Sequence, residues 1–119
     1  MTEAILIASA DGTVVTVNRA FCDITGYTRA DVLGQPEKTF RNALQPPDFY
    51  DEMYAAVLRE GYWSGTTWSK RRNGSVYREW RSVRAVKDAA GAVTHYVSVF
   101  YEVGAGKASG GVAGIPIGA

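Results

Sequence analysis

Few side chains in this 119-residue chain have the types and spacing that catalysis requires. The chain has one histidine, His95, and one cysteine, Cys22, so a thiolate metal cluster cannot form. No Ser-His-Asp arrangement, paired-carboxylate spacing or Gly-rich phosphate loop is present. We therefore expect a protein that is not an enzyme and has no metal site.

The charged residues Glu79 and Arg81 lie two positions apart in a β-rich run, so in a strand their side chains point to one face. Tyr77 and Val83 share that face. The opposite face carries Val76, Arg78, Trp80 and Ser82. Neither face is cleanly apolar, so alternation leaves open which one is buried. If Glu79 and Arg81 are buried, either they pair with each other or Glu79 accepts hydrogen bonds from a ligand.

Three long runs rich in Val, Thr and aromatic residues position this pair, and they predict an antiparallel meander over 62–72, 75–88 and 92–102. Asn73-Gly74 indicates a two-residue type I′ turn, in which both central residues need positive φ. The run Lys70-Arg71-Arg72 beside it is interpreted as a solvated hairpin tip.

The N-terminal half predicts a second hairpin and a block of helices. Residues 4–9 and 13–17 flank Asp11-Gly12, which is a turn signal. Helices are expected from Asn18 to Gly26, from Thr28 to Gly34, for one turn around 39–43, and over 48–60. A helical block between a hairpin and a meander predicts an α+β fold with helices on one face of an antiparallel sheet.

Charge and hydropathy limit the partners and the location that we expect for the domain. The net charge is +1 with interspersed signs, which gives no electrostatic argument for nucleic acid. No apolar run reaches the length of a membrane span, and no signal sequence is apparent. We expect a cytoplasmic domain with no nucleic-acid partner and no membrane segment.

Several motifs in order resemble the PAS domain family. They are Asn18-Arg-Ala-Phe21, Thr25-Gly26-Tyr27, Gly61-Tyr-Trp63-Ser-Gly65, Asn73-Gly74-x-x-Tyr77-x-Glu79-Trp80 and His95-Tyr96-Val97-x-Val99-Phe100. We assign residues 1–103 to this domain and 104–119 to a Gly-rich linker or tail that we expect to be disordered. The chain departs from the family at Glu102-Val103-Gly104, where many members have Asp-Ile-Thr and then a linker helix.

The resemblance implies a five-stranded sheet in the order 2-1-5-4-3 and a small pocket between sheet and helices. It implies that the pocket is lined by nine residues: Phe21, Phe40, Arg41, Ser69, Glu79, Arg81, Tyr96, Ser98 and Phe100. The opposite face of the sheet would carry Trp68, Trp80, Val97, Val99 and Tyr101. A face this apolar indicates an interface, and we expect a homodimer there; the alternative is that the chain's own ends cover it.

The resemblance also bears on cofactors. Flavin photochemistry through a cysteine adduct is disfavoured, because the matching stretch, Phe40-Arg41-Asn42-Ala43-Leu44-Gln45, has no cysteine. Haem is disfavoured because His95, the single histidine, is expected on the outer face. A flavin without the adduct, or a small organic or fatty acid bound by Arg41 or Arg81, stays open.

The function implied is that of a sensory PAS domain that binds a small molecule and regulates an output module. The subtype resembles PAS domains that precede diguanylate cyclase, phosphodiesterase or histidine kinase modules. The alternative is a ligand-free PAS domain whose interior is filled by its own side chains and whose role is protein association. The size of the pocket distinguishes the two.

Overall fold

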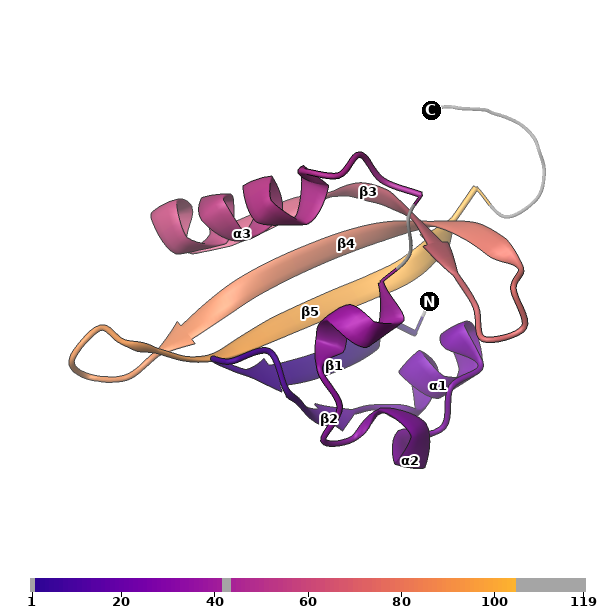
Figure 1. The fold of residues 1–119 in the computed structure, drawn as a ribbon, viewed down its shortest axis with the longest axis horizontal. Coiled ribbons are helices and arrows are strands. Elements are labelled where there is room, and N and C mark those ends of the chain that lie inside the picture. Colours follow the sequence, from indigo (N-terminus) through magenta and orange to yellow (C-terminus); the bar gives the residue numbers. More distant parts are fainter. Residues whose placement is uncertain (1, 42–43, 105–119) are drawn as a thin grey trace.

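The computed structural model describes residues 2–41 and 44–104, which form one antiparallel sheet with helices on one face (Figure 1). The strands are β1 (Ala4–Ser9), β2 (Val14–Val17), β3 (Tyr62–Lys70), β4 (Val76–Lys87) and β5 (Val93–Val103). The helices are α1 (Arg19–Thr25), α2 (Arg29–Val32), the 3₁₀ helix η1 (Glu37–Phe40) and α3 (Phe49–Glu60). The sheet order is β2-β1-β5-β4-β3, so the predicted α+β fold and strand order are confirmed.

Polar caps define the short helices where the sequence predicts them. The Asn18 side chain accepts the Phe21 N–H at the start of α1, and Gly26 ends α1 with φ of 81°. Thr28 and Asp31 form a capping box at α2. Because helices of four to seven residues form too few internal hydrogen bonds to be stable alone, these caps and the packing underneath hold them in place.

The prediction of a two-residue type I′ turn at Asn73-Gly74 is wrong, because the loop has three residues. Arg71 N–H donates to the Ser75 carbonyl and Gly74 N–H to the Arg71 carbonyl, which leaves a three-residue loop. Gly74 closes that loop with φ of 93°, a conformation that a residue with a Cβ rarely adopts. The strand before it therefore ends at Lys70, two residues earlier than expected.

Arg71 is not part of a solvated tip, because it connects three separate elements. Its Nη1 donates to the Ile24 carbonyl at the end of α1 at 2.7 Å, and its Nη2 lies 2.9 Å from the Glu102 carboxylate in β5. The guanidinium also stacks over the Tyr77 ring, 4.2 Å from its centroid. Arg72, by contrast, is largely exposed and contacts Asp31. Hairpin, helix and last strand are thereby joined at one end of the sheet.

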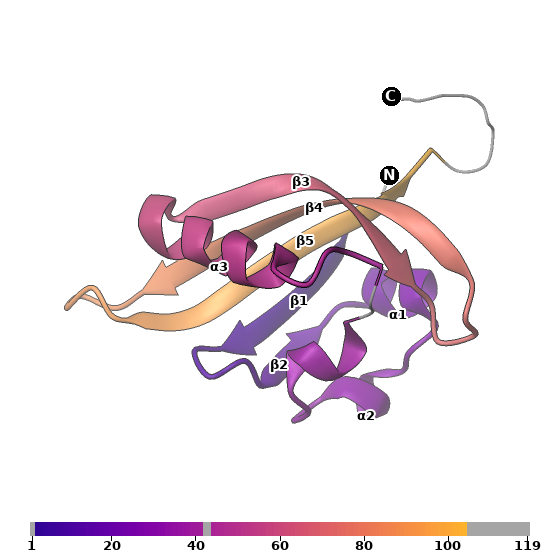
Figure 2. The same ribbon diagram turned by 45° about the horizontal axis from the view of Figure 1, so that its top comes forward.

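The buried apolar residues form two separate clusters. The larger lies under α1 and α2, and its buried members are Ala4, Leu6, Ala8, Val14, Val17, Phe21, Val32 and Phe100. The smaller lies under α3, and its buried members are Met53, Val57 and Val83. Figure 2 shows the corresponding layout, with α3 over β3 and β4, and with α1 and α2 at the β1–β2 end.

Two further expectations concern the connecting segments. The helical turn expected at 39–43 is instead η1 at Glu37–Phe40, because Pro36 sets an extended N-cap and Arg41 is extended again. Residues 42–43 lie outside the described residues, as does the predicted tail apart from Gly104. Within the described ranges, no helix has the length and apolar composition needed to cross a membrane.

Candidate functional site

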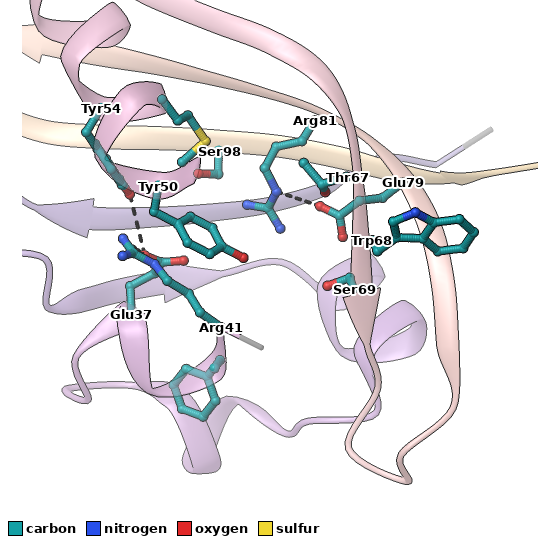
Figure 3. A pocket seen from close by; sticks show the side chains of 12 residues that line it. Glu37, Arg41, Tyr50, Tyr54, Thr67, Trp68, Ser69, Glu79, Arg81 and Ser98 are labelled. Carbon is teal, nitrogen blue, oxygen red and sulfur yellow. Dashed lines mark hydrogen bonds and ion pairs between the residues drawn. The ribbon is translucent and has the colours of Figure 1, made fainter. Parts of the chain in front are cut away.

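A small polar cavity lies between the two apolar clusters, bounded by the sheet on one side and by η1 and α3 on the other (Figure 3). The sheet supplies inward-facing side chains from three neighbouring strands: Thr67, Ser69, Glu79, Arg81 and Ser98. They point the same way because the strands are in register, with Thr67 opposite Glu79 and Arg81 opposite Phe100. This wall is therefore fixed by the hydrogen bonds of the sheet.

Glu79 and Arg81 form a buried ion pair at the centre of this wall. Arg81 Nε lies 2.5 Å from Glu79 Oε2, Glu79 is fully buried, and 16% of the Arg81 side chain is exposed. Burial alone would lower the pKa of the Arg81 guanidinium, but the charge and hydrogen bond of the Glu79 carboxylate, together with Glu37 and Tyr77 nearby, outweigh burial and raise that pKa. The guanidinium also lies 4.3 Å from the Phe100 ring centroid. The two residues pair with each other, as one of the two sequence interpretations requires.

The second carboxylate oxygen of Glu79, Oε1, does not share in this ion pair. Among the described residues, Oε1 is buried and has no hydrogen-bond partner. A buried carboxylate oxygen without a donor costs free energy, of the order of 1–3 kcal/mol or more. The pairing with Arg81 therefore engages Oε2 of the Glu79 carboxylate and leaves Oε1 without a hydrogen-bond donor among the described residues.

The helical wall carries a second ion pair and two tyrosines. Arg41 Nη2 lies 2.9 Å from Glu37 Oε1, one helical turn away, and Tyr54 Oη donates to the same oxygen at 3.4 Å. The Arg41 guanidinium is stacked between two rings, 4.5 Å from the Tyr50 centroid and 5.2 Å from that of Tyr54. Arg41 thereby links the segment after η1 to α3.

Burial and the nearby Glu37 carboxylate raise the pKa of Tyr54 to about 12. Because the folded-state pKa lies above the ordinary value of about 10, the neutral phenol stabilises the fold below pH 10, and this contribution is lost as pH rises through 12. We expect Tyr54→Phe to abolish this part of the alkaline loss of stability. Urea unfolding at pH 8 and pH 11 measures it, with the exposed Tyr62→Phe as control. An equal pH dependence in the Tyr54→Phe variant and the wild type would contradict the assignment.

The cavity has a volume of about 30 Å³. This is room for one or two water molecules, whereas pockets for drug-sized ligands have roughly 300–1,000 Å³. Tyr50, Tyr54 and Arg41 line the cavity on its helical side, and their side chains lie between α3, η1 and the sheet (Figure 3). The site is therefore closed in this conformation.

Six of the nine residues predicted to contact a ligand line this cavity: Phe40, Arg41, Ser69, Glu79, Arg81 and Ser98. Phe21 and Phe100 instead pack against each other in the larger cluster, with ring centroids 5.9 Å apart. Tyr96 packs against Tyr54 at 5.2 Å.

Sequence reasoning missed six further lining residues: Glu37, Tyr50, Met53, Tyr54, Thr67 and Trp68. Trp68 was predicted on the outer face alone, and the structure also places this residue at the cavity. Two signals could have found some of them. Tyr50 and Tyr54 are four residues apart, hence on one face of α3. Thr67 precedes Ser69 by two positions and shares its face.

The outer face of the sheet carries the residues predicted at an interface. Trp68 is 48% exposed and Trp80 37%, while Val97, Val99 and Tyr101 are half-buried there. Trp80 lies opposite Tyr101 in the β4–β5 register, and the Trp68 ring points away from the cavity side chains in Figure 3. Ile5 and Ile7 lie opposite Val99 and Val97, which extends the apolar surface across β1. We call these seven residues the outer apolar face.

This fold is that of the α+β modules in which a five-stranded antiparallel sheet and short helices enclose an interior site. A family model described as PAS domain matches residues 2–104, and the chain belongs to the PAS domain family. In structure it is similar to the PAS domain of a Colwellia psychrerythraea protein, with a TM-score of 0.79 over 85% of this chain and 86% of that one, at 16% identity.

Two curated relatives have regulatory or receptor names. The chain is 29% identical over 96 residues to a nitrogen fixation regulatory protein of Klebsiella oxytoca, which covers 81% of this chain and 19% of that protein. It is 28% identical over 87 residues to the aerotaxis receptor of Escherichia coli, covering 72% of this chain and 17% of the receptor. The chain thus spans about one fifth of the length of the relatives it matches. It is a PAS sensory domain of signal transduction.

Proposed function

We propose that this PAS domain senses a small molecule in the cavity and passes its occupancy to an output module, in the same chain or in a partner. The observation that carries the proposal is the buried Glu79 Oε1, which faces the cavity without a donor. A ligand that donates to this oxygen forms a hydrogen bond that no described residue supplies, so its binding favours the conformation that admits it.

Ligand entry requires the helical wall to move. A flavin, a fatty acid and most small organic acids exceed about 30 Å³, so none fits the closed cavity. The sheet wall is fixed by pairing across three strands, whereas the helical wall is held by the Arg41–Glu37 pair and the tyrosine rings. Displacement of α3 and η1 would therefore report occupancy to the rest of the protein. Output modules of the kinase, diguanylate cyclase or phosphodiesterase type suit such a mechanical signal.

Native mass spectrometry of the purified protein, compared with its denatured mass, tests the ligand. Excess mass that disappears on denaturation supports the sensor and gives the ligand's molecular weight. If the native and denatured masses agree, and the protein purified with cell extract added back still carries none, the domain does not retain a ligand and the proposal fails.

A homodimer through the outer apolar face is the second part of the proposal. The supporting observation is that two tryptophans are exposed beside five half-buried apolar residues on one face. Arg78 lies opposite Trp68 and Arg84 opposite Val97 in the strand register, and their guanidiniums lie 5.7 Å from the Trp68 ring and 5.5 Å from the Tyr62 ring. Aromatic residues and arginine are enriched in protein interfaces. If the cavity binds no ligand, the dimer would serve protein association alone, which is the alternative function.

Trp80→Ala is expected to weaken self-association about 30-fold or more, because a buried interface tryptophan typically contributes about 2 kcal/mol or more. Sedimentation equilibrium measures the dissociation constant, and urea unfolding checks that the fold is kept. Leu58→Ala is the matched control, since Leu58 is 54% exposed on α3, away from the sheet's outer face. An unchanged dissociation constant in the Trp80 variant would remove this face from the interface.

A further inference from the structure

The charges that line the cavity are already balanced. Its carboxylates are Glu37 and Glu79, its guanidiniums are Arg41 and Arg81, and each carboxylate is paired with one guanidinium at 2.9 Å or less. Among the described residues, a carboxylate ligand would find no unpaired cation in this cavity. It would also approach Glu79, a fully buried carboxylate, and repulsion between like charges is strong where water is excluded.

Unlike the charges, the hydrogen-bonding groups of the sheet wall are not all paired. Glu79 Oε1 is an acceptor without a donor. Arg81 donates to Glu79 through Nε, and its two Nη groups have no acceptor among the hydrogen bonds of the described residues. One open acceptor therefore lies beside open donors, on two residues of the same face of β4.

The geometry points to a neutral ligand with an amide-type edge, in which an N–H donates to Glu79 Oε1 and the adjoining carbonyl oxygen accepts from Arg81 Nη. Amides, lactams and imides carry this pair of groups at adjacent atoms and add no charge. Arg81 is held in place by Phe100 beneath its guanidinium, so its donors are oriented before the ligand arrives. The inference rests on the proposed ligand site and specifies which chemistry that site selects.

The hydroxyls of Thr67, Ser69 and Ser98 complete the wall around this pair. Each can donate or accept, so they adapt to the rest of the ligand without setting its charge. In the empty state, one or two waters in the cavity would occupy the same positions, and a ligand with an amide edge reproduces the hydrogen bonds of the water it displaces.

Matched pairs of small probes test the inference: acetamide against acetate, and nicotinamide against nicotinate. Each pair differs in charge and in the N–H donor while keeping size and shape. We expect the amides to shift the backbone amide NMR resonances of β4 and β5 around Glu79 at about tenfold lower concentration than the acids. Glu79→Gln should weaken amide binding about tenfold or more and narrow the difference between amide and acid. Glu102→Gln is the same change in a carboxylate that pairs with Arg71 outside the cavity. It should leave both the amide affinity and the difference between amide and acid unchanged.

The outcomes separate this inference from the proposed function. Equal or tighter binding of the acids, with shifts in the same residues, overturns the ligand class and leaves the site standing. If no probe shifts these resonances at any concentration and the native mass equals the denatured mass, the site itself fails. A Glu79→Gln variant that keeps the full preference for amides also overturns the inference, because the preference would then arise elsewhere.

Discussion

Arg81→Ala should lower the free energy of unfolding by about 3–5 kcal/mol, because it leaves the Glu79 carboxylate fully buried without a counter-charge. Urea denaturation at neutral pH measures the change. The matched control is Arg84→Ala, which lies on the same strand but points to the exposed outer face and should cost about 0.5 kcal/mol or less. Equal losses in the two variants would mean that the buried pair contributes nothing specific.

Replacing Glu79 and Arg81 together tests whether their ion pair is needed for the stability of the fold or only for the proposed ligand site. With both Glu79 and Arg81 replaced by methionine, no buried charge is left unpaired, and stability should return to near the wild-type value or above. Such a protein would be folded and unable to offer the open acceptor to a ligand. A double variant as unstable as Arg81→Ala would show that the cost arises from lost packing.

Phe100→Ala is expected to cost about 3–5 kcal/mol, which is usual for a large aromatic residue removed from a core. Phe100 is 1% exposed, contacts Phe21 edge-on, and lies beneath the Arg81 guanidinium. Thermal or urea unfolding measures the loss, with the half-exposed Leu58→Ala expected to cost far less. Phe100→Leu retains most of the buried area but not the ring under Arg81. If Phe100→Leu costs as much as Phe100→Ala, the contact of the ring with the Arg81 guanidinium is the main contribution of Phe100 to stability.

Local backbone features could be predicted well from sequence. Caps such as Asn18 and Thr28 act through their own side chains on neighbouring N–H groups, so the signal lies within four residues. Strand order followed from the family resemblance rather than from periodicity. The β4 pattern could not show which face is buried, because the pair that alternation marks as polar, Glu79 and Arg81, is the pair that the fold buries.

Features that depend on distant partners could not be predicted. Arg71 looks like a surface residue until α1 and β5 bring the Ile24 carbonyl and Glu102 to it, 47 and 31 positions away in the chain. The helical wall was missed for the same reason. Glu37 has a local partner in Arg41, but its contact with Tyr54 depends on how α3 packs across the cavity. A three-residue loop at Gly74 also differs from a two-residue turn by the pairing of Arg71 with Ser75, which the dipeptide alone does not specify.

The division of the core into two clusters has a consequence for local unfolding. Eight buried residues anchor the α1–α2 side, whereas Met53, Val57 and Val83 are the buried residues under α3. The free energy needed to open α3 should therefore be a fraction of that needed to unfold the whole domain, and its amides should exchange with solvent deuterium sooner than those of β1 and β5. A layer that detaches at low cost can admit a ligand while the sheet stays intact.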